Sequence, residues 1–444
     1  MNQTRLAVAI VLALLMVAGW ASALGGQISE ASKVSQTLEK AQAEESQRLY
    51  AKAILSYEEV LAEKESKARY QDLDRVYALY YAESPTNQVR RAYTDLLSRA
   101  CRAYPKETDF WAHRAQLSLD RHDYAEAVRI LQQAEDKGAA NEEMKAQLQE
   151  AYYLLDEGYQ AYTDILPGCW QGNYVVRADG EHWGMVTADG SDLLSAVYPM
   201  MGPIGLSGQV AVTDANGESW LIDAGGMLQV HYSEKLAEAG CWSEGMLPAK
   251  AAGSDTWSYF TDDGAEVLTG YLSAGSFYDG KAAVETADGW RIIDTDGKAV
   301  EDETWEAILL DENGAYEQDG CIMAQSGGQW RLYSGSWKER KDFSCDEIGV
   351  HKDGLIAFRR GGLWGFVTEK GEETIAPAYQ EARSFSGGVA AVRENGKWGF
   401  LTEDGTLVVD YQYSDVGCFD PSSGTCAVQR ESDDWAVAGW VVTH

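Results

Sequence analysis

The spacing of hydrophobic residues changes once along the chain, near residue 166. In the first part, apolar side chains recur every three or four residues, which is the period of an α-helix. In the second part, short apolar runs alternate with polar turns such as ADG, TDG and EDG, which is typical of strands joined by tight turns. The clearest helical stripe consists of Tyr124, Ala127, Val128, Leu131 and Ala134. The pattern therefore predicts an α-helical region followed by a strand-rich region.

The strand-rich region is a repeat array. In one unit, residues 391–393, 398–402 and 406–410 form three strand-like runs separated by two turns. Aligning the region on the tryptophan of this unit gives eight units with a period of roughly 36 residues. A glycine precedes each tryptophan at a nearly constant distance, so two landmarks keep the same register. The repeat tryptophans are Trp183, Trp220, Trp257, Trp290, Trp330, Trp364, Trp398 and Trp435.

A unit of three or four short strands is marginally stable alone, so neighbouring units must stack. Eight units of this length suit the blades of a β-propeller, and we expect an eight-bladed ring, with an open β-solenoid as the alternative. A strand exchanged between the two ends of the array would close the ring. Because each tryptophan heads a strand in every unit, we predict that these side chains pack the blades and do not form a ligand platform.

Two phrases of the array resemble a known family. GLWGFVTEKGEETIAP and GKWGFLTEDGTLVV carry Trp364-Gly365 and Trp398-Gly399, and they look like the tryptophan-glycine (WG) repeats of many bacterial proteins. HWGMVTADG at Trp183 is similar. In the other units Leu221, Ser258, Arg291, Arg331 and Ala436 replace the glycine. The resemblance implies a β-rich array that binds proteins or other ligands, and it carries no shared catalytic residues.

The helical region resembles tetratricopeptide repeats. The stretch FWAHRAQLSLDRHDYAEAVRILQQAEDKG places Trp111, Ala115 and Tyr124 at the expected positions, although His122 and Ala139 depart from the pattern. Similar segments precede it, around Tyr50 and between residues 87 and 105. We expect about three repeats and a capping helix over residues 141–165. A plain helical bundle is the alternative.

Residues 6–24 form an apolar stretch without a charged side chain, just long enough to span a bilayer. The triplet Ala21-Ser22-Ala23 within this stretch also fits a cleavable secretory signal. We favour a membrane anchor, because the helical pattern resumes directly after it. Both interpretations place the remainder of the chain outside the cytoplasm. The predicted domains are residues 1–26 as anchor or signal, 27–166 as helical repeats and 167–444 as the β array.

The net charge of the strand-rich region narrows the classes of partner that the protein can bind. Residues 167–444 hold 45 acidic and 18 basic side chains, a net charge of −27 within the −33 of the whole chain. Such a surface repels nucleic acids and anionic lipids.

The chain contains seven cysteines. Three of them, Cys169, Cys241 and Cys418, occupy one repeat position, which favours a packing role; a Cys418–Cys426 disulfide is the alternative.

The sequence contains no catalytic signature, and its six histidines are scattered. Acidic turns such as the one at Asp294–Gly297 are explained by hairpin geometry without calcium. We therefore predict no catalytic residue, no metal and no cofactor, and the ligand-binding residues remain unknown. The predicted function is a membrane-tethered binding scaffold for a protein or glycan at the cell envelope. An extracellular glycan hydrolase and a structural spacer are the alternatives.

Overall fold

The computed structural model describes residues 32–300, 302–340 and 343–442. The chain divides after Tyr152 into two compact units, a helical unit and a propeller unit. The predicted anchor at residues 6–24 lies outside the described residues. Within the residues that the structure describes, no helix is long and apolar enough to cross a membrane.

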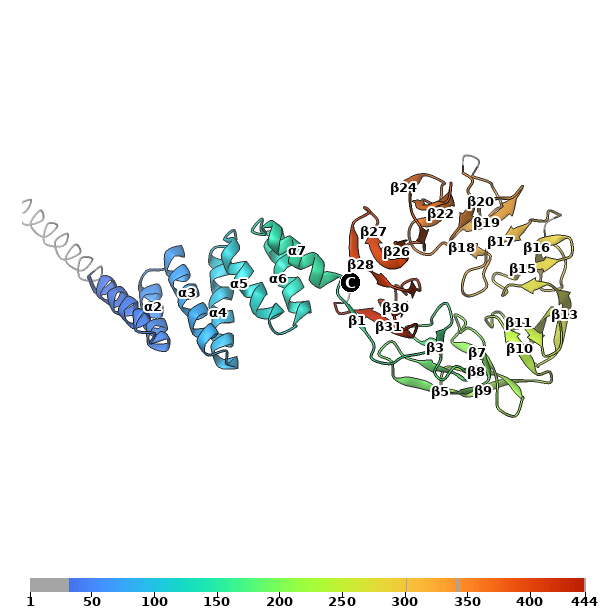
Figure 1. Cartoon of the computed structure of the whole chain (residues 1–444), viewed down its shortest axis with the longest axis horizontal. Coiled ribbons are helices and arrows are strands. Elements are labelled where there is room, and N and C mark those ends of the chain that lie inside the picture. The colour runs from blue at the N-terminus through green and yellow to red at the C-terminus, as the bar shows by residue number, and fades with distance from the viewer. Residues whose placement is uncertain (1–31, 301, 341–342, 443–444) are drawn as a thin grey trace, which may run out of the picture. The chain divides into compact units, whose positions relative to one another are not determined.

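The helical unit consists of seven successive helices in the described residues (Figure 1). Its core is formed by apolar side chains at helical spacing, including Leu73, Leu96 and Ala115, which are completely buried. Asp123 begins one of the helices, because its carboxylate accepts a hydrogen bond from the backbone N–H of Glu126. The helices are residues 32–46, α2 (Tyr50–Glu63), α3 (Lys67–Glu83), α4 (Asn87–Ala103), α5 (Thr108–Leu119), α6 (Tyr124–Asp136) and α7 (Glu142–Tyr152).

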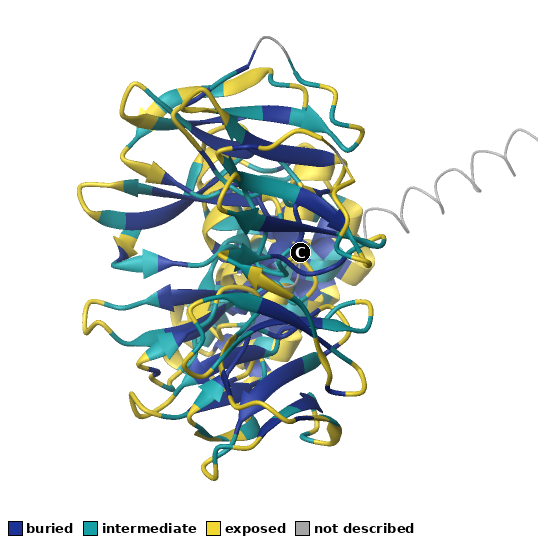
Figure 2. Cartoon of the chain, turned by 90° about the vertical axis from the view of Figure 1, so that its right-hand side faces the viewer, coloured by how far each residue is buried: buried dark blue, intermediate teal, exposed yellow. Residues whose placement is uncertain are grey.

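The propeller unit consists of eight small antiparallel sheets arranged in a ring, so the predicted eight-bladed propeller is confirmed (Figure 1). Burial is concentrated along the middle of the strands, and the turns at both faces are exposed (Figure 2). Blade 1 is β2 (Asp164–Ile165), β3 (Tyr174–Arg177), β4 (Trp183–Val186) and β5 (Asp192–Tyr198). Blade 2 is β6 (Met200–Met201), β7 (Gln209–Thr213), β8 (Ser219–Asp223) and β9 (Leu228–Tyr232). Blade 3 is β10 (Leu236–Ala239), β11 (Met246–Ala251), β12 (Trp257–Thr261) and β13 (Glu266–Tyr271).

The remaining blades follow in chain order. Blade 4 is β14 (Ser273–Ala274), β15 (Lys281–Thr286) and β16 (Gly289–Asp294). Blade 5 is β17 (Ala307–Ile308), β18 (Glu317–Gln318), β19 (Cys321–Ser326) and β20 (Gln329–Ser334). Blade 6 is β21 (Glu347–Ile348), β22 (Ile356–Arg360), β23 (Leu363–Val367) and β24 (Glu373–Tyr379). Blade 7 is β25 (Glu381–Ala382), β26 (Val389–Glu394), β27 (Lys397–Thr402) and β28 (Leu407–Tyr413).

The ring is closed by a strand from the beginning of the unit. Blade 8 contains β29 (Asp415–Val416), β30 (Thr425–Gln429) and β31 (Trp435–Trp440), and β1 (Leu155–Glu157) pairs with β31 as its fourth strand. The antiparallel register places Leu155 opposite Trp440 and Glu157 opposite Ala438. The exchanged strand therefore makes the array a closed ring and not an open solenoid.

The predicted capping helix over residues 141–165 is too long. Helix α7 ends at Tyr152, and residues 155–157 and 164–165 are strands of the propeller unit. The unit boundary accordingly lies at Tyr152, earlier than the predicted residue 166. The reason is the partner strand β31, which lies far away in the sequence and offers its edge to residues 155–157. A local hydrophobic pattern contains no information about that pairing.

The eight repeat tryptophans stand at the first or second position of the third strand in their blades, when β17 and β18 of blade 5 are counted as one strand. Trp183 and Trp398 are buried, the other six are partly buried, and none is exposed. Trp398 packs in the cluster between blades 7 and 8 with Phe400 and Phe419. This placement is that of a packing residue.

The glycine after the tryptophan has a steric cause in the three units that keep it. A Cβ atom on Gly399 would lie 2.5 Å from the carbonyl oxygen of Val409 on the neighbouring strand. The corresponding distances are 2.5 Å for Gly365 and 2.6 Å for Gly184. The register of the third and fourth strands shifts at these positions, which brings the two backbones together. In the WG pair, a packing tryptophan is therefore followed by a glycine at which two neighbouring backbones approach closely.

Candidate functional site

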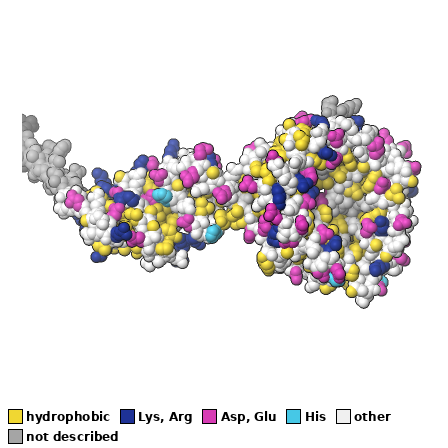
Figure 3. All heavy atoms as spheres, in the orientation of Figure 1, with side chains coloured by type: hydrophobic (Ala, Val, Ile, Leu, Met, Phe, Trp, Pro, Cys, Tyr) yellow, Lys and Arg dark blue, Asp and Glu magenta, His cyan; other side chains and the backbone are white. Residues whose placement is uncertain are grey.

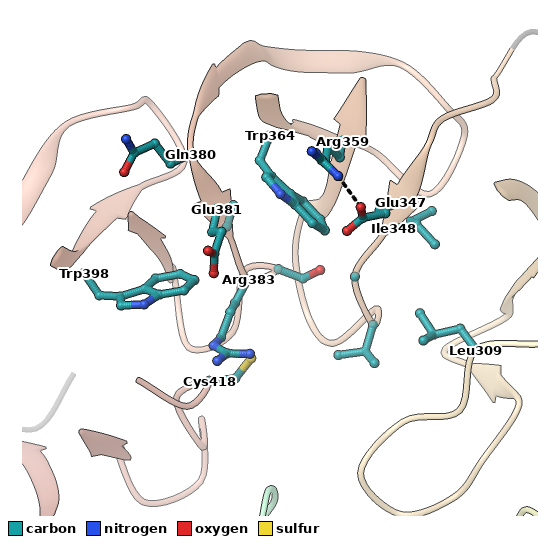
Figure 4. Close-up of a pocket in the computed structure, with 14 residues that line it drawn as sticks. Leu309, Glu347, Ile348, Arg359, Trp364, Gln380, Glu381, Arg383, Trp398 and Cys418 are labelled. Atoms are coloured by element: carbon teal, nitrogen blue, oxygen red, sulfur yellow. Dashed lines mark hydrogen bonds and ion pairs between the residues drawn. The ribbon is translucent and has the colours of Figure 1, made fainter. Parts of the chain in front are cut away.

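A cavity of about 510 Å³ in the propeller unit lies between the innermost strands of blades 6 and 7 (Figure 4). This is within the size range of ligand pockets. Strands β21 and β25 form its two sides, and Leu309 from blade 5 and Cys418 from blade 8 complete it. Its lining residues are Leu309, Glu347, Ile348, Gly349, Val350, Arg359, Trp364, Gln380, Glu381, Ala382, Arg383, Ser384, Trp398 and Cys418.

Ion pairs are repeated around this pocket. Glu347 at the start of β21 lies opposite Arg359 of β22, and the two side chains form an ion pair. Glu381 at the start of β25 pairs with Arg393 of β26 in the same register. The repeat thus places a carboxylate on the innermost strand and a guanidinium on the next one. Each pair leaves the pocket wall polar without a strong net charge.

Arg383 joins the pocket to blade 8. Its guanidinium donates to the Asp415 carboxylate at 2.9 Å, and its Cζ lies 5.1 Å from the ring centre of Trp398. A guanidinium at this distance from an indole face is attracted to the ring. In Figure 4, Trp364 and Trp398 lie on either side of Glu381, with Arg383 below. The pocket therefore combines apolar ring surface with fixed charges of both signs.

Two hydrogen bonds hold the walls of the pocket in place. The Ser384 hydroxyl accepts from the backbone N–H of Ala357 at 2.9 Å, which connects blade 7 to blade 6. The side-chain carbonyl of Gln380 accepts from the N–H of Gly396 at 3.1 Å, in the turn between β26 and β27. These bonds make the pocket a preformed feature of the ring.

An insertion in blade 5 crosses the centre of the ring. The segment from Ile308 to the landmark glycine Gly320 is about twice as long as the equivalent segment of blade 7, from Ala382 to Gly388. The extra length splits the innermost strand into β17 and β18, and residues 309–315 between them project into the ring. We call residues 309–315 the channel loop.

Contacts of Glu312 show how far the channel loop reaches. Its carboxylate lies 2.5 Å from the Lys352 ammonium in blade 6, and its carbonyl accepts from the Cys241 thiol of blade 3 at 3.6 Å. A Cβ atom on Gly168, in blade 1 on the opposite side of the ring, would lie 2.9 Å from the Glu312 Cβ. The channel loop therefore spans the central channel.

The channel loop is anchored along its length. The carbonyl of Gly314 accepts from the N–H of Ser276 at 2.9 Å, and the carbonyl of Asn313 accepts from the Tyr278 hydroxyl at 3.1 Å. The Asp311 carboxylate accepts from the N–H groups of Asn313 and Ala315 inside the loop. Burial raises the pKa of Asp311, and these hydrogen bonds oppose the rise. The loop is thus a fixed element.

Lys352 keeps its charge inside the ring. Burial lowers the pKa of Lys352, but the adjacent Glu312 carboxylate, together with Cys418 and Asp311, raises it, so the pKa lies above its usual value. The pair connects the channel loop to blade 6, next to the pocket.

The residues predicted from the sequence are distributed as follows. Cys241 and Cys418 face the channel loop or the pocket, and all seven cysteines are free, so the alternative Cys418–Cys426 disulfide is not formed. The Asp294 carboxylate accepts from two backbone N–H groups of its own turn, as hairpin geometry requires. No group of three His, Cys, Asp or Glu side chains that could hold a metal ion occurs among the described residues.

Of the pocket residues, only Trp364, Trp398 and Cys418 were singled out from the sequence, and all three were assigned to packing. The spacing between Trp290 and Trp330, the longest between successive repeat tryptophans, was the available signal for the insertion. The ion pairs gave a weaker signal, because an acidic residue precedes an arginine by the same separation in blades 6 and 7.

Comparisons with known proteins find one repeat family and several similar solved structures. The family model for the WG containing repeat matches residues 364–398 and 398–432. A search of the curated proteins finds no match to the chain. Among solved structures, BamB from Moraxella catarrhalis is similar at 12% identity and a TM-score of 0.42, over 64% of this chain and 98% of that chain. A streptogramin B lyase is similar at 13% identity and a TM-score of 0.33, over 54% of this chain and 92% of that chain.

The helical unit has its own likeness. The TPR domain of Sgt2 from Aspergillus fumigatus is similar at 16% identity and a TM-score of 0.21, over 27% of this chain and 76% of that chain. Residues 364–432 thus match the WG containing repeat, within an eight-bladed β-propeller that follows a helical unit.

Proposed function

We propose that the protein is a non-enzymatic scaffold that binds a partner protein through the pocket between blades 6 and 7. The observation that carries the proposal is the preformed pocket of about 510 Å³, whose wall combines the partly buried Trp364 and the buried Trp398 with fixed ion pairs. Aromatic and arginine side chains are enriched where proteins bind each other. Repeat architectures also offer broad surfaces for protein partners.

The charges of the pocket support binding more than hydrolysis. Glu347 and Glu381 each form an ion pair with an arginine, so both carboxyl groups already have a partner within the propeller. A glycan hydrolase requires one carboxyl group that is protonated and ready to donate. The mixed charges suit a protein segment that carries both acidic and basic side chains. A glycan is the second candidate, because a partly buried indole such as Trp364 and an exposed amide such as Gln380 also suit sugars.

The proposed site of action is the outer side of a membrane at the cell envelope. The apolar residues 6–24 support a tether there, and the acidic surface of the propeller unit supports solubility outside the cell. Acidic side chains are spread over the propeller surface around a hollow at its centre (Figure 3). The same charge speaks against nucleic acid as a partner.

The test is crosslinking at the cell surface, followed by capture of the full-length chain and identification of the bound proteins. Arg359→Gln removes one guanidinium from the pocket and exposes the charge of Glu347. Arg177→Gln is the matched control, because Arg177 pairs with Asp164 and lies opposite Trp183 in blade 1, at the same repeat position. We expect Arg359→Gln to lose the partner and Arg177→Gln to retain it. Equal capture by both variants, or capture of glycan alone, would contradict the proposal.

A further inference from the structure

The pocket and the channel loop can be placed along the axis of the ring from the strand pairing. The innermost strands start at the face that carries the β22–β23 and β26–β27 turns, since Gln380 bonds to Gly396 of the β26–β27 turn. We call this the entry face. From Gln380 to Ser384, the pocket lining follows β25 and the residues after it away from the entry face.

The channel loop lies at the end of this lining that is farthest from the entry face. Leu309, its first residue, is itself part of the pocket wall, and Cys418 is the lining residue from blade 8. Beyond Leu309, the Glu312 carboxylate pairs with Lys352, which follows the blade 6 strand that ends at Ile348. Gly314 and Asn313 are fixed to Ser276 and Tyr278 in blade 4, also past the end of the innermost strand.

From these contacts we infer that the channel loop makes the pocket blind, so that a partner reaches it only from the entry face. The inference rests on the proposed function of the pocket. Glu312 touches blades 1, 3 and 6, and no chain segment can pass the ring axis while these contacts are made. The pocket therefore fits a short projecting segment of a partner protein, such as a loop or a chain end, and excludes a chain that threads through the ring.

The route of access can be measured without knowing the partner. Cys418 lines the pocket, and its peptide is identified by mass spectrometry after reaction of the folded full-length protein with N-ethylmaleimide. Burial raises the pKa of the Cys418 thiol, so the reaction is run at about pH 8.5 to supply thiolate. Gln380→Trp places an indole at the entry face. Ser422→Trp is the matched control, because Ser422 is an exposed residue of blade 8 in the loop between β29 and β30, beyond Cys418.

We expect Gln380→Trp to slow the labelling of Cys418 about tenfold and Ser422→Trp to change it less than about twofold. Slowing by Ser422→Trp, or equal slowing by both variants, would overturn the inference. A deletion of residues 309–314 gives blade 5 the length of blade 7 and should make the labelling insensitive to Gln380→Trp. If that deletion variant does not fold, the two tryptophan variants decide alone. Loss of partner capture with unchanged labelling rates would affect the proposed function and leave this inference intact.

Discussion

The Lys352 ammonium and the Glu312 carboxylate lie 2.5 Å apart inside the ring, and they join the channel loop of blade 5 to blade 6. Both side chains are mostly buried, so neither charge is well solvated if the other is removed. The pair is therefore important for the position of the channel loop, although it is a small part of the contacts in the ring.

Removal of one member of this pair should destabilise the propeller unit. We expect Glu312→Gln to lower the free energy of unfolding by about 3 kcal/mol, because Lys352 is left charged and unpaired. Chemical denaturation, followed by tryptophan fluorescence, measures the change. Lys298→Gln is the control, since Lys298 forms an exposed ion pair with Asp296, and it should leave the denaturation midpoint unchanged. A Glu312→Gln midpoint equal to that of the wild type would show that the pair does not hold the loop.

Replacing a repeat tryptophan with alanine should lower the stability of the propeller unit. Trp398 is 3% exposed and packs between blades 7 and 8. We expect Trp398→Ala to lower the free energy of unfolding by roughly 3–5 kcal/mol, because the substitution leaves a large cavity. Tyr159→Ala is the control, since Tyr159 is 88% exposed and should cost less than about 0.5 kcal/mol. If Trp398→Ala bound no partner yet melted like the wild type, the tryptophan would be a ligand platform after all.

If the glycine of the WG pair is required for steric reasons, adding a single methyl group there should lower the free energy of unfolding. Gly399→Ala should destabilise the propeller unit by about 1–3 kcal/mol, because the new Cβ would lie 2.5 Å from the carbonyl oxygen of Val409. Gly417→Ala is the control, since its Cβ would have its nearest neighbours at an ordinary 3.6 Å. Thermal unfolding by calorimetry compares the two. Similar melting temperatures for both variants would mean that the close approach in blade 7 relaxes without cost.

The helical unit should lose stability as the pH rises through the raised pKa of His113. His113 bonds to both oxygens of the buried Asp74 at 2.9 and 3.0 Å, and the Tyr93 hydroxyl donates to the same carboxylate at 2.6 Å. The hydrogen bond to Asp74 raises the pKa of His113, with burial acting against it and Asp109 adding to the rise. The folded state therefore binds the proton more tightly than the unfolded state. The stabilisation from this proton is complete below the unfolded pKa of about 6.5 and is lost as the pH passes the folded value.

Hydrogen exchange of the α3 and α5 amides at about pH 6 and about pH 8.5 tests this expectation, because it reports on the helical unit alone. The wild type should show less protection at the higher pH after correction for the intrinsic exchange rate. His113→Gln should remove that difference, and the matched variant His122→Gln should keep it. A pH dependence that survives in His113→Gln would assign the effect to another group.

Much of the fold could be predicted because the same local sequence pattern recurs in each unit. The two landmarks of each unit, Trp398 and Gly388 in blade 7, recur often enough to count eight blades. The helical stripe from Tyr124 to Ala134 likewise predicted α6. Features that depend on distant pairing were missed: β1 was taken for the end of a helix, and the bond between Glu312 and Lys352 joins residues with no common pattern. The pocket could not be predicted, because its walls come from four blades that only the closed ring brings together.

The pairing of β1 with β31 also has a consequence for the order in which the protein is made. Leu155 emerges from the ribosome long before its partner Trp440, and until then β1 has no partner strand. Contacts between residues so far apart form slowly, because a long loop must first be closed. The helical unit, whose contacts are local, can fold during this interval. Completion of the ring is therefore a late event, and β1 stays unpaired until blades 1–7 and the other three strands of blade 8 have been synthesised.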